Sequence, residues 1–162
     1  MIEIDFENQT AYQKEEAWLP LMRRYIEKTL KTEGVDLDLN AYEVSLTWVE
    51  PETIHKLNAQ YRQVDRETDV LSFPMYEFPR DKAVLSTPSK IPVLLGDIVL
   101  NPARAKEQGE KYGTGMKREM CYLTVHSMLH LLGYDHMEAA DKQKMRAREK
   151  AIIGDVDAPQ PI

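Results

Sequence analysis

Residues 126–136 read His-Ser-Met-Leu-His-Leu-Leu-Gly-Tyr-Asp-His and contain three of the four histidines of the chain. His126 and His130 are four positions apart, so on a helix both imidazoles lie on one face, one turn from each other. Gly133 stands where a glycine can end a helix in a left-handed conformation, and the chain can then bring His136 to the same point. Three histidines with no fourth ligand nearby are the ligand set of a catalytic zinc site with an open position.

The residues from Cys121 to Leu132 are apolar nearly all the way round, which indicates a buried helix. A single histidine on such a helix is usually a core residue satisfied by a backbone carbonyl. Three buried imidazoles in one cluster need a shared partner, because their polar nitrogens would otherwise lack hydrogen bonds. We therefore predict one bound zinc ion, or another divalent metal, with His126, His130 and His136 as its ligands.

The spacing of the histidines and Gly133 is also that of the metzincin proteases. Those enzymes carry glutamate as general base directly after the first histidine, where this chain has Ser127. A serine cannot take a proton from zinc-bound water at neutral pH. Zinc held by three neutral imidazoles can ionise its bound water near pH 7 without a protein base. A metallopeptidase-like hydrolase is thus favoured by spacing and opposed by Ser127.

The histidine block resembles the signature of the YbeY family of bacterial endoribonucleases, also described as rRNA maturation factors. The family usually has glycine at the position of Ser127. Two further blocks resemble the family: Leu-Asn-x2-Tyr-Arg at 57–62, leading to Thr-Asp-Val-Leu-Ser-Phe-Pro at 68–74, and Leu-Gly-Asp-Ile at 95–98. The blocks follow family order, and the histidine block is the most specific of them.

The resemblance implies a zincin-like, metal-dependent endoribonuclease that cleaves single-stranded RNA, matures the 3′ end of 16S rRNA and acts in ribosome quality control. Its partners would be rRNA precursors and the small ribosomal subunit, and no DNA is expected. Arg62 matches the arginine of the family's Tyr-Arg block and is placed in the catalytic site with the three histidines. A planar guanidinium suits two-donor contact with a phosphodiester. The alternative role for Arg62 is a structural salt bridge.

A third function stays open beside the nuclease and the peptidase. The chain can be a non-catalytic, zinc-containing ribosome assembly factor, which requires a fourth protein ligand that closes the metal shell. Near the metal site, Asp135 can accept a hydrogen bond from an imidazole or cap the turn after Gly133. His55 stands far from the other histidines in the sequence, and we predict that it lies on the surface.

The composition describes an ordinary globular protein, with 162 residues, 43% hydrophobic and 30% charged. We predict a single endoribonuclease domain over residues 1–153 and a flexible tail over 154–162. The single Cys121 excludes an intramolecular disulfide and fits a reducing cytoplasm. No signal peptide or membrane span is recognisable, so we expect a cytoplasmic protein. A net charge of −6 does not suggest nucleic acid, and RNA enters only through the resemblance.

Periodicity predicts an α+β fold, with a small mixed sheet of about four strands packed with about five helices and the metal site on a buried helix. The predicted strands cover 2–6, 42–49, 69–73 and 93–100, and the predicted helices 13–32, 51–61, 102–112, 116–132 and 138–153. The helix between the first two strands favours their parallel pairing. Four of the nine prolines lie in residues 74–92, which indicates an irregular loop at the rim of the cleft.

Overall fold

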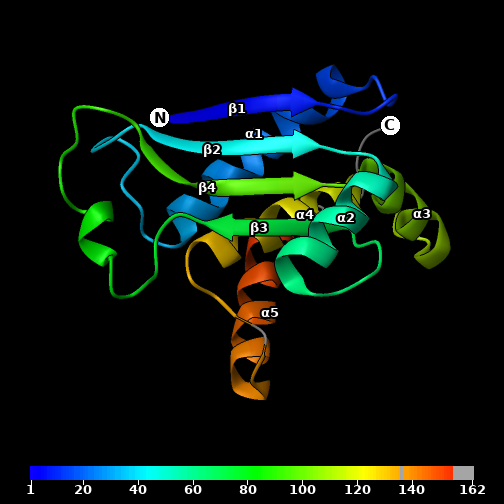
Figure 1. Ribbon diagram of the computed structural model, residues 1–162. Coiled ribbons are helices and arrows are strands. Elements are labelled where there is room, and N and C mark those ends of the chain that lie inside the picture. Colours follow the sequence, from blue (N-terminus) through cyan, green and yellow to red (C-terminus); the bar gives the residue numbers. More distant parts are fainter. Residues whose placement is uncertain (136, 155–162) are drawn as a thin grey trace.

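The computed structural model describes residues 1–135 and 137–154. It contains one sheet of four strands, which are β1 (Ile2–Asn8), β2 (Tyr42–Trp48), β3 (Val70–Pro74) and β4 (Val93–Leu100). The strand order is β1-β2-β4-β3 (Figure 1). The first three strands in this order are parallel, and β3 runs antiparallel to β4 along one edge of the sheet. The predicted mixed sheet and the parallel pairing of the first two strands are confirmed.

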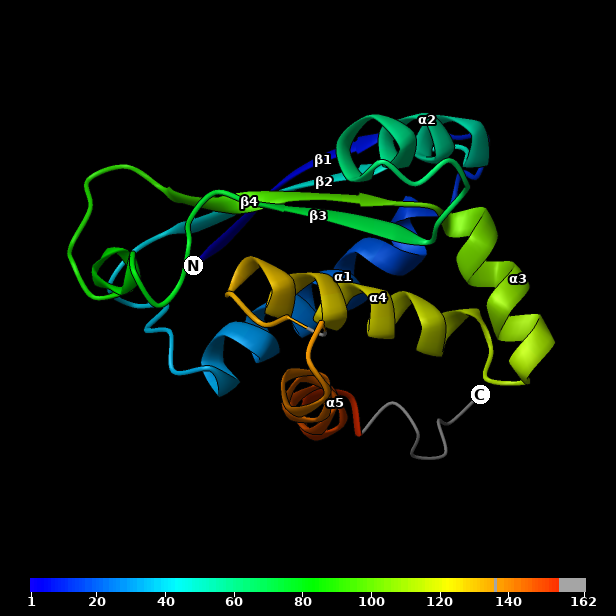
Figure 2. The ribbon, with the colours of Figure 1, turned by 60° about the horizontal axis from the view of Figure 1, so that its bottom comes forward.

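Five helices pack around the sheet, as predicted. They are α1 (Glu15–Thr32), α2 (Pro51–Arg62), α3 (Pro102–Tyr112), α4 (Met116–Leu131) and α5 (Ala139–Ile153). Figure 2 shows α1 and α4 on one face of the sheet, α2 on the other, and α5 on the side of α4 that faces away from the strands. The arrangement is an α+β fold in which α4 lies between the sheet and α5.

The start of α1 differs from its predicted position. The helix begins at Glu15 instead of residue 13, and β1 extends to Asn8. The Asn8 side chain accepts from the Thr10 N–H at 2.9 Å and donates to the Tyr12 carbonyl at 2.8 Å. These bonds hold a turn between strand and helix, because an asparagine side chain competes with helical hydrogen bonding.

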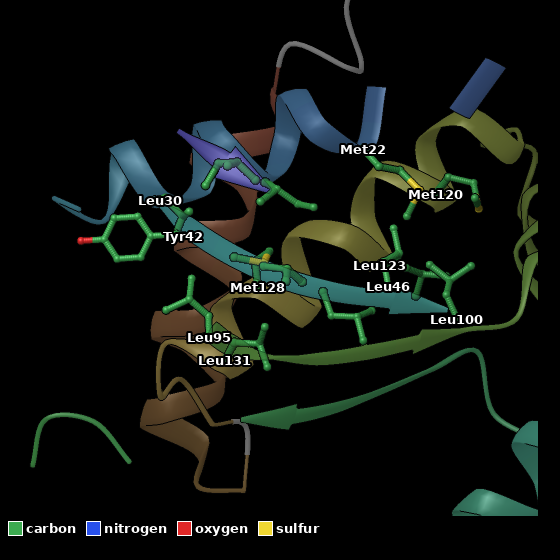
Figure 3. Packing of buried hydrophobic residues seen from close by; sticks show 14 of the residues in the cluster. Met22, Leu30, Tyr42, Leu46, Leu95, Leu100, Met120, Leu123, Met128 and Leu131 are labelled. Carbon is green, nitrogen blue, oxygen red and sulfur yellow. The ribbon is translucent and has the colours of Figure 1, made fainter. Parts of the chain in front are cut away.

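The core lies between the sheet and the helices α1 and α4 (Figure 3). Side chains alternate strictly along β2, where Tyr42, Val44, Leu46 and Trp48 are buried. From the other side α4 contributes Met120, Leu123, Met128 and Leu131, all at most 1% exposed. Burial at about 25 cal/mol per Å² of apolar surface makes this layer the main source of stability. The predicted buried helix is confirmed, and it gives the histidines a rigid support.

Close approach of the backbone at Gly96 lets α4 reach the β3 edge of the sheet. A Cβ atom at this position would lie 2.4 Å from the Phe73 carbonyl oxygen and 2.8 Å from Leu131 Cδ2, and Gly96 has φ of +150°. Only glycine fits such a place. The Leu-Gly-Asp-Ile block therefore has a packing reason: it allows the C-terminal end of α4 to sit against β3.

Residues 75–92 connect β3 to β4 as the predicted irregular loop, with one short 3-10 helix over Lys82–Leu85. Asn40 anchors this loop, since its side chain donates to the Thr87 carbonyl at 2.9 Å and accepts from the Ser89 N–H at 2.7 Å. Among the described helices, none is long and apolar enough to cross a membrane. Of the predicted tail over residues 154–162, the structure describes only Gly154, and residues 155–162 lie outside its described part.

Candidate metal centre

Helix α4 brings His126 and His130 together on its partly exposed face. The Nε2 atoms of the two imidazoles lie 3.1 Å apart. The ring planes are nearly perpendicular, at 84°, with centroids 4.6 Å apart. The predicted convergence of these two side chains on one point is therefore observed in the geometry of the helix.

Each of the two rings has an acceptor at its other nitrogen. His130 Nδ1 lies 2.9 Å from the Tyr134 carbonyl oxygen, and His126 Nδ1 lies 3.2 Å from Glu149 Oε1. A carbonyl and a carboxylate can only accept, so we assign the ring protons to the two Nδ1 atoms. In the neutral imidazoles both Nε2 atoms then carry a lone pair, and these lone pairs face each other.

Two facing lone pairs repel unless a cation lies between them, so this arrangement suits a metal ion. Two nitrogens that bind one zinc at about 2.0–2.1 Å with a tetrahedral angle are about 3.3–3.4 Å apart. The observed 3.1 Å between the Nε2 atoms is close to that separation. Each Nδ1 contact also has the form that orients histidine ligands in metal sites. The residues present fit zinc.

The third predicted ligand, His136, lies outside the described residues. Among residues 1–135 and 137–154, no group of three or more His, Cys, Asp or Glu side chains is placed to hold a metal ion. The geometry therefore brings together His126 and His130, and the role of His136 stays a prediction.

Gly133 ends the histidine helix as predicted. It has φ of +99°, and the Tyr134 N–H donates to the Leu129 carbonyl at 3.0 Å, as in a left-handed helix end. A Cβ atom on Gly133 would lie 3.0 Å from the Phe78 Cβ. This turn places the Tyr134 carbonyl at His130 and packs the loop after β3 against the site. Asp135 Oδ1 accepts from the Met137 N–H at 3.2 Å, a contact of the turn-capping kind, and the hydrogen bond from Asp135 to an imidazole stays a prediction.

A cavity of about 680 Å³ opens beside the two histidines, between α4 and the edge strand β3. The loop after β3 forms its rim through Tyr76, Glu77 and Phe78, as predicted for residues 74–92. Its volume is within the usual range for small-ligand sites, about 300–1,000 Å³. We call it the main cavity.

Arg62 lines the main cavity together with His126 and His130. It comes from the last turn of α2, donates from Nη2 to the Ser72 carbonyl at 2.6 Å and lies over the Phe73 ring at 5.1 Å. Within the described part of the chain Arg62 forms no salt bridge, which was the alternative role predicted for it. Its structural contacts are with an uncharged carbonyl and an aromatic ring. Its positive charge remains available to a ligand.

Ser127 cannot replace the missing protease base. Its side chain is fully buried and lines none of the cavities near the histidines. Two other side chains lie outside the main cavity. Cys121 is buried in a packing cluster with Val125 and Leu129, and His55 lies on α2 with its Nε2 2.8 Å from Asp65.

Sequence reasoning missed Glu149, the partner of His126. Glu149 is only 5% exposed and occupies the same side of α5 as the buried residues Met145, Ile152 and Ile153. A carboxylate at a core position of an amphipathic helix was the available signal, because a buried charge needs a partner. The pKa of the neighbouring Tyr122 hydroxyl is raised above its ordinary value, mainly by burial and secondly by the negative charge of Glu149.

A second missed network fixes the turn that follows α4. Arg148 Nε donates to Glu33 Oε2 at 2.8 Å, and the Tyr134 hydroxyl donates to the same carboxylate. The hydrogen bond to Glu33 is the main cause that raises the pKa of Arg148. These contacts join α1, α5 and the turn, so they hold the Tyr134 carbonyl in position for His130.

Comparisons with known proteins find similar proteins over most of the chain. The family model described as endoribonuclease YbeY matches residues 3–157. The protein named endoribonuclease YbeY from Clostridium acetobutylicum is 44% identical over 146 residues, covering 84% of this chain and 86% of the relative. Its namesake from Bacillus cereus strain B4264 is 40% identical over 150 residues, covering 93% of each. The solution structure of TM1509 from Thermotoga maritima has the same fold, with a TM-score of 0.57, 24% identity, and coverage of 99% of this chain and 100% of that one.

Proposed function

The chain belongs to the YbeY family of endoribonucleases, and on that premise we propose that it is a zinc-dependent enzyme that cleaves single-stranded RNA in the main cavity. The observation that carries the zinc site is the pair of Nε2 atoms 3.1 Å apart, each oriented by an acceptor at Nδ1. We further propose that the substrate is an rRNA precursor of the small ribosomal subunit, processed at the 3′ end of 16S rRNA in the cytoplasm.

His126 and His130 would hold the zinc ion, with His136 as the third ligand. When bound, the ion supplies a Lewis acid that polarises a phosphoryl oxygen and lowers the pKa of coordinated water. Arg62 lines the same cavity and can donate two hydrogen bonds to the phosphodiester. Its positive charge stabilises the negative charge that increases on the phosphate in the transition state. Glu149 and the Tyr134 carbonyl keep the imidazoles oriented.

Two observations favour RNA over a peptide substrate. An extended peptide would add to the free edge of β3, where the Ser72 carbonyl already accepts from Arg62. The residue after the first histidine is Ser127, which carries no carboxylate to act as a general base and is buried. The metallopeptidase alternative therefore lacks the usual base, and one acceptor of the edge that it would use is already engaged.

Removal of the metal tests this proposal. We expect a chelator to remove about one metal equivalent per chain and to abolish cleavage of an unstructured RNA and of a 16S rRNA 3′ precursor, and zinc to restore both. Elemental analysis and gel assays follow the two quantities together. Cleavage that persists in metal-free protein would refute zinc dependence. Hydrolysis of casein at a comparable rate would favour the peptidase instead.

Glu149→Gln is expected to weaken zinc binding about 10- to 100-fold. Glutamine has nearly the same size but no negative charge, so the His126 imidazole becomes a less basic ligand. Competition with a chelating dye measures the affinity, and the exposed Glu110→Gln on α3 is the matched control. Equal zinc affinity in the two variants would show that Glu149 does not orient the metal ligand.

A further inference from the structure

A second hollow, of about 250 Å³, lies between α4 and α5 and shares His126 with the main cavity. Its lining consists of Tyr122, His126, Lys142, Met145, Arg146 and Glu149. We infer that this α4–α5 hollow binds a backbone phosphate of the RNA strand beside the phosphodiester that is cleaved, with Lys142 and Arg146 as the contacts. The inference rests on the proposed function and adds a subsite to it.

Two cations and one carboxylate line the α4–α5 hollow. Lys142 and Arg146 are both exposed and lie four positions apart on α5, so they share one side of the helix. Neither forms an ion pair within residues 1–135 and 137–154. The carboxylate in the lining, Glu149, is buried and 3.2 Å from His126 Nδ1, so it is already engaged. Two uncommitted cations one turn apart suit a phosphate, which accepts from both.

The main cavity has the opposite balance of charge. Its lining includes the carboxylates of Asp69, Glu77 and Asp135 against the single guanidinium of Arg62. One N–H of that guanidinium already donates a hydrogen bond to the Ser72 carbonyl. The proposed metal ion and Arg62 would hold the cleaved phosphodiester, and a further phosphate meets a more favourable balance of charge in the α4–α5 hollow than at the acidic rim of the main cavity.

The surface of α4 offers a continuous path between these sites. Tyr122 lies one turn before His126 and stacks on its ring, with centroids 5.5 Å apart and an interplanar angle of 27°. Tyr122 also lines a third hollow, together with Arg118. Along α4 a row of side chains at four-residue spacing therefore borders the three hollows: Arg118, Tyr122, His126 and His130. This row spans about 18 Å at 1.5 Å per residue. Figure 2 shows α5 nearly end-on beneath α4, so α5 crosses α4. A single strand can follow the row, with a base against Tyr122.

Salt dependence of RNA binding tests the inference independently of catalysis. We would introduce Lys142→Gln with Arg146→Gln into the His130→Ala protein and measure binding of a fluorescein-labelled single-stranded oligoribonucleotide by anisotropy over a series of NaCl concentrations. The slope of log K against log salt is negative, and each neutralised phosphate contributes about 0.7 to its magnitude, so loss of the one phosphate held in the hollow should reduce that magnitude by about 0.7. Affinity at low salt should fall on the order of tenfold.

A matched control separates local contacts from net charge. Lys31→Gln with Lys56→Gln removes the same charge from exposed positions of α1 and α2 that line none of these cavities, and it should leave the slope unchanged. Equal slopes in the two double variants would overturn the inference. If the Lys142 and Arg146 double variant does not fold by circular dichroism, each single variant should still reduce the magnitude of the slope, by at most about 0.7, and a single variant with the slope of the control would overturn the inference. Failure of the proposed function would instead appear as RNA cleavage that His130→Ala leaves intact.

Discussion

Replacing His130 with alanine is expected to remove metal binding and to lower the rate of RNA cleavage at least about 10³-fold. A bound metal ion contributes several kcal/mol to the stabilisation of transition-state charge, and 10³-fold corresponds to about 4 kcal/mol. The variant should fold, because alanine favours helices and α4 is held by buried residues such as Leu129 and Leu131. Metal content by elemental analysis and cleavage by gel assay should therefore be lost together.

His55→Ala is the matched control for this prediction. It also removes an imidazole from a helix, but His55 pairs with Asp65 away from the main cavity. Metal content and cleavage rate should equal those of the wild type. A His130→Ala protein that retains a full equivalent of metal would show that His130 is not a ligand. Retained cleavage without metal would mean that the nuclease activity comes from elsewhere.

The features predictable from the sequence are those with a local pattern. Strict alternation over residues 42–48 identified β2, and apolar residues on all sides of α4 identified a buried helix. The four-residue spacing of His126 and His130 was sufficient to place both side chains on one face of α4, because helical geometry makes such residues neighbours. Helix and strand ends shifted by only a few residues, and side-chain bonds such as those of Asn8 explain the shift at α1.

Features that depend on distant packing were not predictable in the same way. The orientation of His126 depends on Glu149, which is 23 positions away on another helix. The orientation of His130 depends on a turn that Glu33 and Arg148 hold, and these residues are 115 positions apart. Periodicity does not reveal which helix meets which, so such pairs emerge only once α1, α4 and α5 are packed. The position of β3 at the sheet edge, which gives Arg62 its route to the main cavity, belongs to the same class.

Arg62→Ala is expected to lower kcat about 10²- to 10³-fold while the protein keeps its full metal content. Loss of one charged donor to a transition state typically has an effect of this size. Arg62→Lys should recover part of the rate, because lysine keeps the charge but cannot make the planar two-donor contact. Single-turnover cleavage with saturating enzyme measures the step directly. Arg66→Ala, an exposed arginine outside the main cavity, is the control and should behave as the wild type.

The division of the effect between kcat and KM identifies what Arg62 does. A loss confined to KM would mean that the guanidinium holds the substrate equally in ground and transition states, and a loss in kcat means that it acts as charge develops. Its contacts with Ser72 and Phe73 contribute only about 1 kcal/mol each to stability, so unfolding in urea should change little. A large loss of stability with normal kcat would instead make Arg62 a support for the β3 edge. An unchanged cleavage rate in Arg62→Ala would show that Arg62 takes no part in catalysis, although it lies in the same cavity as the histidine pair.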